Sequence, residues 1–247
     1  MASGIGVRTA LHSLAQRASG HDYMTATLQG AVFRIPANAS EFNYYRDAIA
    51  NLKKLVDAVE GDEVKTIVDV GANLGHFSAL ALARWPKANV FAFEPAPAMA
   101  RQIEQALGSR VTLVREALCD TDGVIRDFFI NDHSHATNSL LKENVERFNP
   151  DTSSVTVRTA TLDGFCARCG LERIDVLKVD IQGAESAFLR GARRMIRNTG
   201  CALVEASFLD PDPVIVSQTL DAAFARRRVI NLVLSGADIA YDRPRSL

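Results

Sequence analysis

The chain has 247 residues, of which 28 are Lys or Arg and 29 are Asp or Glu, giving a formal net charge of −1. A hydrophobic fraction of 47% and a charged fraction of 23% are ordinary for a soluble globular protein and argue against intrinsic disorder. The charge balance lacks the basic excess of nucleic-acid-binding proteins, so we expect no nucleic-acid partner. No apolar run reaches the ~18–20 residues that cross a bilayer, so we expect no membrane span.

The four cysteines are too few and too scattered for a disulfide scaffold. Cys166 and Cys169 have the spacing of half a zinc site, but the sequence has no second pair to complete it. We therefore expect reduced cysteines with a structural role. We see no apolar segment of the secretory type near Met1, and we expect a cytoplasmic protein.

The first 62 residues are expected to form a cap on the main domain rather than an independent domain. Helical spacing of apolar residues predicts a short helix around residues 11–15, and residues 22–36 have the character of a short β segment. Ser40 then opens a long helical pattern, which Gly61 closes.

From Lys65 onward, short apolar strands alternate with helices. This alternation is typical of a parallel sheet covered by helices on both faces. The expected strands are 66–70, 89–93, 111–114, 124–130, 155–159, 174–180, 202–205, 229–234 and 239–241. The expected helices are 77–85, 97–107, 184–196 and 214–226, and residues 131–153 are expected to form a polar loop. Residues 63–247 are therefore predicted to form one α/β domain.

The segment Asp69-Val70-Gly71-Ala72-Asn73-Leu74-Gly75 lies between a predicted strand and a predicted helix, where α/β sheets meet nucleotide-like ligands. Gly71 allows a sharp turn, and Gly75 allows the helix to pack close to the strand or the ligand. Asn73 tolerates a left-handed backbone better than most residues. A dinucleotide fingerprint would have glycine at positions 73 and 76, but Asn73 and His76 stand there. The pattern is instead Asp-x-Gly-x-Asn-x-Gly.

Glu94 ends the next predicted strand and precedes Pro95. A carboxylate at this position can accept hydrogen bonds from both hydroxyl groups of a ribose. The alternative is that Gly71 and Gly75 only form a tight turn between a strand and a helix. The turn and Glu94 together favour a ligand site.

Several further segments follow in a fixed order along the chain. They are Phe93-Glu94-Pro95-Ala96-Pro97, Glu116-Ala117-Leu118-Cys119-Asp120, Asn138-Ser139-Leu140, Thr161-Leu162-Asp163, residues 174–185, Gly191-Ala192 and Glu205. Together with the glycine-containing turn, they make residues 64–206 resemble the FkbM family of S-adenosylmethionine-dependent methyltransferases. The resemblance implies a class I methyltransferase fold, with a Rossmann-like, mostly parallel sheet and an antiparallel strand near the C-terminus.

The resemblance also implies which residues bind S-adenosylmethionine. The cofactor would be held by Asp69, Gly71, Asn73, Gly75, Glu94, Pro95 and Asp180, and its adenine would be flanked by Glu116, Ala117 and Leu118. The family more often has Glu at the position of Gln182. A catalytic or metal-binding role for a carboxylate at that position is therefore in question for this chain.

Methyl transfer to a hydroxyl requires aligned reactants and a base for the hydroxyl proton. Asp180 ends a strand next to the predicted cofactor strand, so its carboxylate is expected to face the crevice, although it could also cap the following helix. Glu185, in the first turn of that helix, is a second candidate that the helix dipole explains equally well. His133 and His135 are candidate bases in a polar loop, where solvated histidines are the alternative.

The leading hypothesis is an O-methyltransferase acting on a hydroxyl of a sugar, a glycan precursor or a polyketide-type small molecule. This acceptor class follows from the resemblance alone. No metal site is predicted, although a divalent ion held by Asp180, Glu185 and a histidine stays an open alternative. A homodimer is likewise left open. Two other functions compete: an NAD-type oxidoreductase on a similar fold, and a non-catalytic binding protein that kept the fold.

Overall fold

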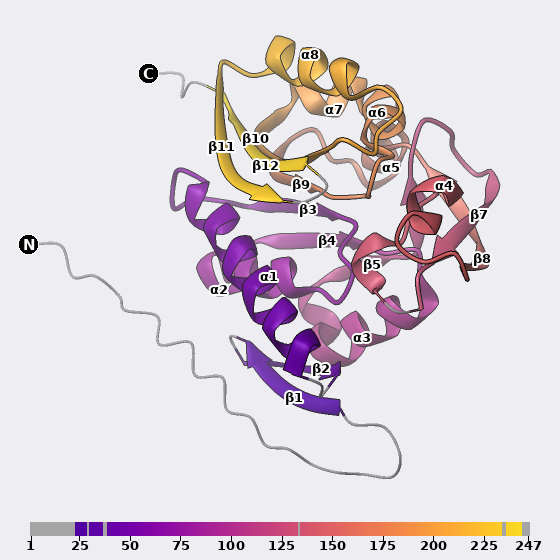
Figure 1. The fold of residues 1–247 in the computed structure, drawn as a ribbon. Coiled ribbons are helices and arrows are strands. Elements are labelled where there is room, and N and C mark those ends of the chain that lie inside the picture. The colour runs from indigo at the N-terminus through magenta and orange to yellow at the C-terminus, as the bar shows by residue number, and fades with distance from the viewer. Residues whose placement is uncertain (1–22, 29, 37–38, 133, 234–235, 244–247) are drawn as a thin grey trace, which may run out of the picture.

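The computed structural model describes residues 23–28, 30–36, 39–132, 134–233 and 236–243. Figure 1 shows a layered α/β architecture, in which a central sheet lies between two groups of helices. The helix predicted around residues 11–15 and the loop residue His133 lie outside the described residues.

The central sheet has seven strands in the order β11-β12-β10-β9-β3-β4-β5. The parallel strands are β3 (Thr66–Val70), β4 (Asn89–Phe93), β5 (Thr112–Val114), β9 (Ile174–Val179) and β10 (Thr199–Ser207). β12 (Gly236–Asp242) runs antiparallel to both β10 and β11 (Arg226–Val233). This arrangement confirms the prediction of a mostly parallel sheet with an antiparallel strand near the C-terminus.

Successive residues of the central strands face opposite layers of helices, as the two-residue period of a strand requires. Ile67 packs with α1 (Ala39–Ala58), α2 (His76–Arg84) and α3 (Pro97–Leu107). Its neighbour Val68 packs on the other face, in a cluster that includes side chains of four helices. These are α5 (Leu162–Cys169), α6 (Glu185–Arg190), α7 (Arg193–Arg197) and α8 (Pro213–Ala223) (Figure 1).

The described part of the N-terminal cap is a hairpin of β1 (Tyr23–Leu28) and β2 (Ala31–Pro36), followed by α1. The prediction of a single β segment over 22–36 is wrong in this respect, because the chain reverses near Gly30, whose φ is 78°. Phe33 and Val56 are buried in the same cluster as Ile67. The cap thus shares a core with the sheet, while its boundary at residues 62 and 63 stays a prediction.

A second, smaller sheet has the order β6-β8-β7 and flanks the carboxyl ends of the central strands. It consists of β6 (Glu116–Leu118), β7 (Ile125–Ile130) and β8 (Ser153–Ala160). The segment predicted as a loop over 131–153 contains the short helix α4 (Lys142–Glu146) and a single-turn helix at His135–Thr137. The polar character of this segment conceals both, because each helix is only one turn long.

The helices differ from the prediction in number as well as by a few residues at their ends; α8, for example, ends at Ala223 and not at residue 226. The helix expected over 184–196 is divided into α6 and α7 at Gly191, where an added Cβ would lie 2.0 Å from the carbonyl oxygen of Cys119. α5 is absent from the prediction although Thr161 caps it, accepting a hydrogen bond from the N–H of Gly164 at 2.9 Å. Its eight residues are too few to show a clear helical period.

The buried centre of the sheet gives a test of the fold. Leu177 of β9 is fully buried and lies opposite Val68 and Ala202 of the neighbouring strands. Leu177→Ala is expected to lower the free energy of unfolding by about 2–5 kcal/mol, because it removes buried methyl groups and leaves a cavity. Urea denaturation checks this. Leu232→Ala is the matched control: Leu232 is 83% exposed, so a change within about 0.5 kcal/mol is expected. Equal losses in the two variants would contradict the placement of β9.

Candidate functional site

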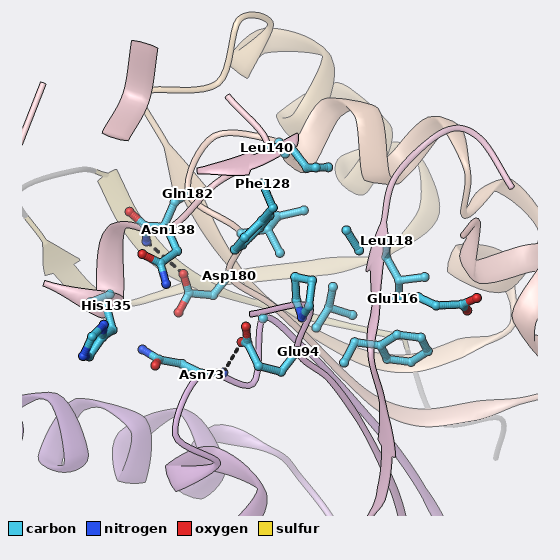
Figure 2. A pocket seen from close by; sticks show the side chains of 18 residues that line it. Asn73, Glu94, Glu116, Leu118, Phe128, His135, Asn138, Leu140, Asp180 and Gln182 are labelled. Atoms are coloured by element: carbon cyan, nitrogen blue, oxygen red, sulfur yellow. Dashed lines mark hydrogen bonds between the residues drawn. The ribbon is translucent and has the colours of Figure 1, made fainter. Parts of the chain in front are cut away.

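A pocket opens at the carboxyl ends of β3, β4 and β9 (Figure 2). The small sheet and the segment 135–140 supply its other walls. The lining consists of Val70, Gly71, Asn73, Phe93, Glu94, Pro95, Glu116, Ala117, Leu118, Phe128, His135, Ala136, Asn138, Leu140, Asp180, Ile181, Gln182 and Ala184. Parallel strands thus bring together residues that lie more than a hundred positions apart in the sequence, at the edge of the sheet where α/β proteins bind ligands.

Most of the residues predicted for the site line this pocket. They are Gly71, Asn73, Glu94, Pro95, Glu116, Ala117, Leu118, His135 and Asp180. Three predicted residues, Asp69, Gly75 and Glu185, are not part of the lining. His133 lies outside the described residues. The structure therefore assembles most of the predicted set, while the roles of its members stay predictions.

The turn after β3 is fixed by its backbone. Gly71 has a φ of 75° and Asn73 a φ of 51°, both in the left-handed region. The N–H groups of residues 71 and 72 donate to the carbonyl oxygen of Phe93, which ties the turn to β4. An added Cβ at Gly71 would lie 2.0 Å from the carbonyl oxygen of Asp180. Only glycine therefore fits where the turn passes over the end of β9.

Glu94 is buried and braces the same turn. Its Oε2 accepts a hydrogen bond from the N–H of Asn73 at 2.8 Å, and its Oε1 accepts one from the N–H of Ala96 at 2.9 Å. Burial raises the pKa of Glu94 to about 7, although both hydrogen bonds oppose the shift. The Oδ1 atom of Asn73 is buried with no hydrogen-bond partner in the described protein. An unpartnered acceptor beside a carboxylate fits a ligand that carries hydrogen-bond donors, such as ribose hydroxyls or an ammonium group.

A buried lysine connects the turn to β9. The Nζ of Lys178 donates to the carbonyl oxygen of Gly71 at 2.8 Å and lies 3.5 Å from Asp69 Oδ1 and 3.4 Å from Asp180 Oδ2. Burial alone would lower the pKa of Lys178, but the two carboxylates outweigh it and raise that pKa. Lys178 has no predicted role at the site. A lysine inside an apolar, buried strand requires an anionic partner, and that signal could have identified it.

Asp180 faces the pocket beside Gln182 (Figure 2). The Nε2 of Gln182 donates to Asp180 Oδ1 at 2.9 Å and to Glu205 Oε2 at 3.1 Å. Burial would raise the pKa of Asp180, but Lys178 and the hydrogen-bonding side chains around it lower that pKa. Asp180 is therefore an ionised carboxylate at the pocket wall. Gln182 and Glu205 belong to the family resemblance, but neither has a predicted role at the site.

Asp69 and Gly75, two predicted cofactor residues, lie outside the pocket lining and flank the turn. Asp69 is fully buried inside β3, where its Oδ2 accepts a hydrogen bond from the hydroxyl of Ser78 at 2.7 Å. Gly75 precedes α2 with a φ of 83°, and an added Cβ would lie 3.1 Å from Leu107 of α3. Asp69 thus pairs with Lys178, and the absence of a Cβ at Gly75 lets α2 approach α3.

Glu185 is fully buried and holds the loop that follows β9. Its Oε1 accepts hydrogen bonds from the N–H groups of Ile181 at 3.2 Å and Gly183 at 3.3 Å. Burial raises the pKa of Glu185 to about 8. The geometry does not support the predicted contact of Glu185 with a substrate, because its side chain is absent from the lining and engaged with the loop.

Among the described residues, no group of three or more His, Cys, Asp or Glu side chains is arranged to hold a metal ion. The ligand set considered from the sequence, with Asp180 and Glu185, is not assembled around the pocket. The four cysteines are free thiols, of which only Cys169 is exposed.

The comparison with known proteins agrees with this geometry. The family model described as "Methyltransferase FkbM domain" matches residues 69–226, well over half of the chain. The "2-O-methyltransferase NoeI" of Sinorhizobium fredii is 30% identical over an alignment that covers 57% of this chain and 63% of that protein. The "Hexuronic acid methyltransferase AglP" of Haloferax volcanii is 28% identical, over 70% of this chain and 67% of that protein.

The fold is also found among solved structures. The M. jannaschii TYW2 structure in complex with AdoMet matches with a TM-score of 0.50 and 11% sequence identity, covering 92% of this chain and 90% of that chain. At this identity the likeness establishes the fold alone. It confirms the class I methyltransferase fold that the sequence predicts.

The buried acid Glu185 predicts a pH dependence of stability. The folded chain keeps the Glu185 proton up to about pH 8, whereas an unfolded chain loses it near pH ~4.3. Between these values the folded state binds more protons, so this group makes the free energy of unfolding fall as the pH rises. Glu185→Gln cannot ionise and keeps an oxygen acceptor for the loop.

Urea denaturation of the two proteins across this pH range measures the effect. The Glu185→Gln variant should show a flatter fall in the free energy of unfolding than the unmodified protein. Glu172→Gln, at an exposed position, is the control and should keep the original slope. If the Glu185→Gln and unmodified slopes agree, Glu185 is ionised in the folded protein and the assignment is wrong.

Proposed function

The chain belongs to the FkbM methyltransferase family, and we propose that it moves the methyl group of S-adenosylmethionine to a hydroxyl oxygen of a sugar, glycan precursor or polyketide-type small molecule. The family assignment confirms the methyltransferase class and the methyl donor expected from the sequence. It therefore favours a methyltransferase over the competing hypothesis of an NAD-type oxidoreductase. The chain spans about 63% of the length of NoeI, so the acceptor and the residue roles are proposals.

One observation carries the proposal: a single pocket joins the Gly71–Asn73 turn, the buried carboxyl group of Glu94 and the ionised Asp180. The first two are suited to a cofactor that presents hydroxyl and ammonium donors. The third is suited to an acceptor hydroxyl, because a carboxylate can take its proton. The three come from the ends of neighbouring strands, so cofactor and acceptor sites would adjoin.

The residues present fit the cofactor. Glu94 would accept hydrogen bonds from the ribose, and Asn73 Oδ1 supplies an unpartnered acceptor in the same wall. Ala117 and Leu118 of β6, with Phe128 and Leu140, form an apolar wall suited to the adenine. When bound, the cofactor supplies the electrophilic methyl group. Glu116 and Pro95 also line the pocket.

Asp180 is the proposed general base for the acceptor hydroxyl. Lys178 and Gln182 hold one oxygen each, which fixes the orientation of the carboxylate. His135 also lines the pocket and is the second candidate for this role. The printed names of NoeI and AglP, a 2-O-methyltransferase and a hexuronic acid methyltransferase, support a sugar hydroxyl as the acceptor.

The remaining expectations concern partners and location. None of the helices in the described part of the chain is long and apolar enough to cross a membrane. Cytoplasmic location, a homodimer and the lack of a nucleic-acid partner stay predictions. The near-zero net charge favours a neutral or weakly charged acceptor.

Replacing the proposed base separates catalysis from binding. Asp180→Asn is expected to lower turnover by about 10²- to 10⁴-fold, because the acceptor proton loses its base. If Asp180 acts on the acceptor rather than holding the cofactor, the dissociation constant for S-adenosylhomocysteine should change by no more than about threefold, and a larger change would support the cofactor role instead. A labelled-methyl transfer assay against a panel of glycans and natural products, with calorimetry for the cofactor product, measures both. Undiminished turnover would remove Asp180 as the base, and a protein that binds the cofactor product but methylates no acceptor would favour the non-catalytic alternative.

The raised pKa of Glu94 leads us to expect that cofactor binding depends on pH. Its ionised form accepts ribose hydrogen bonds more strongly, so affinity for S-adenosylhomocysteine should rise as the pH passes through about 7. Glu94→Gln should weaken binding by about tenfold or more and abolish this dependence. Calorimetric titrations at pH 6, 7 and 8 test it, with melting temperature as the check on folding. An affinity of the unmodified protein that does not change across this range would contradict the proposed contact.

A further inference from the structure

Asn138 lines the same pocket as Asp180, and Figure 2 shows its side chain next to those of Asp180 and Gln182. The backbone of the following residue, Ser139, pairs with Phe129 of β7 through two hydrogen bonds of 2.8 and 3.2 Å. The hydroxyl of Ser139 donates to the carbonyl oxygen of Gln182 at 3.0 Å. These contacts tie the segment that carries Asn138 both to the small sheet and to the loop that carries Asp180.

The orientation of the Asn138 amide follows from its hydrogen bond to the backbone. Its Oδ1 accepts from the N–H of Asn131 at 2.9 Å. A backbone N–H can only donate, so the amide oxygen faces Asn131 and the amide nitrogen takes the other side. Asn138 is buried, and within the described part of the chain its Nδ2 has no hydrogen-bond partner. Buried polar groups of this kind are normally satisfied, so Nδ2 is suited to a bound ligand.

The carboxylate of Asp180 supplies the complementary group. Lys178 and Gln182 each contact one of its oxygens, at 3.4 and 2.9 Å. A carboxylate can accept about four hydrogen bonds, so capacity remains for an O–H group of a ligand. The pocket therefore presents an amide that only donates and a carboxylate that only accepts.

A hydroxyl group matches this pair better than an amine does. Its O–H donates to Asp180, one lone pair of its oxygen accepts from Asn138, and the second lone pair stays available for attack. An uncharged amine nitrogen has a single lone pair, which the attack consumes. An amine acceptor would therefore leave Nδ2 of Asn138 without a partner in the transition state, and an unpaired buried donor is costly.

We propose that Asn138 is an acceptor-binding residue that makes the site selective for hydroxyl groups over amines. Its Nδ2 donates to the acceptor oxygen while the hydroxyl proton faces Asp180. The second lone pair of that oxygen forms the bond to the methyl carbon, the electron pair of the broken C–S bond stays on sulfur, and the O–H proton passes to Asp180. The products are a neutral ether and S-adenosylhomocysteine. This inference rests on the proposed function and assigns to one residue the choice of acceptor atom.

Paired acceptors test the selectivity in the labelled-methyl transfer assay. The probes are methyl glycosides of glucose, galactose, mannose and glucuronic acid, each beside analogues in which one hydroxyl is replaced by an amino group. The assay runs at about pH 9, where an amine of the α-amino type is mostly uncharged. Mass spectrometry separates O-methyl from N-methyl products. We expect the unmodified protein to favour hydroxyl groups by about tenfold or more in kcat/KM.

Three variants separate the role of the amide nitrogen from that of the amide oxygen. Asn138→Leu should lower kcat/KM for the hydroxyl probes by about tenfold and leave that for the amines unchanged. Asn138→Asp keeps an oxygen for the N–H of Asn131 but exchanges the donor for an acceptor, so it should move the preference further toward amines. Asn89→Asp, at the exposed start of β4, is the matched control and should change neither rate. Melting temperatures check that each variant is folded.

Calorimetry with S-adenosylhomocysteine completes the test. Both Asn138 variants should bind it within about threefold of the unmodified protein, and a loss of binding in proportion to the loss of turnover would assign Asn138 to the cofactor and overturn the proposal. Hydroxyl transfer as fast in both variants as in the unmodified protein would also overturn it, while the proposed function would stand. If the unmodified protein methylates only amines, or none of the probes, the proposed function fails and the proposal fails with it.

Discussion

The geometry of the pocket depends on the contacts of the Lys178 ammonium group. A buried charge without partners costs several kcal/mol, and Lys178 obtains its partners from three places: the carbonyl oxygen of Gly71, Asp69 of β3 and Asp180 after β9. The position of the turn, the register of two strands and the charge of the acid at the pocket wall are therefore linked. A shift of any of the three takes a partner away from this buried charge.

The ion pair between Lys178 and Asp180 explains why the pKa of Asp180 is shifted in the opposite direction from those of the neighbouring acids. Burial raises the pKa values of Glu94 and Glu185, and neither has a cation as its main partner. Asp180, with Lys178 3.4 Å away, has its pKa lowered instead. Enzymes that need an acid and a base in one site use this kind of separation by environment. Here it leaves an anion at the end of β9, while burial raises the pKa of Glu94 to about 7 and that of Glu185 to about 8.

The parts of the fold and site that the sequence predicts are those set by local rules. The Gly71 turn, Glu94 and Asp180 follow apolar strands, and parallel strands bring such positions to one edge of the sheet. Phe128 escapes prediction because a second sheet, built from distant segments, carries it into the lining. Leu140 reaches the lining because the preceding residue, Ser139, pairs with Phe129 of that sheet. The division of α6 from α7 escapes it for a similar reason, since a contact at Cys119 decides it. Short helices such as α4 and α5 have too few residues to establish a period.

Asp69 is a motif residue whose surroundings in the structure differ from those that the motif suggests. Its place in the glycine-containing motif suggests a ligand contact, yet it is fully buried and bound to Ser78 and Lys178. The motif cannot distinguish these roles, because both require an acid at the same position. Strand periodicity can: Asp69 shares the face of Ile67, which packs beneath the α1–α3 layer, and it lies one residue inside the end of β3. At that depth Asp69 contacts Lys178, which binds the turn at Gly71, so Asp69 supports the pocket wall through the turn.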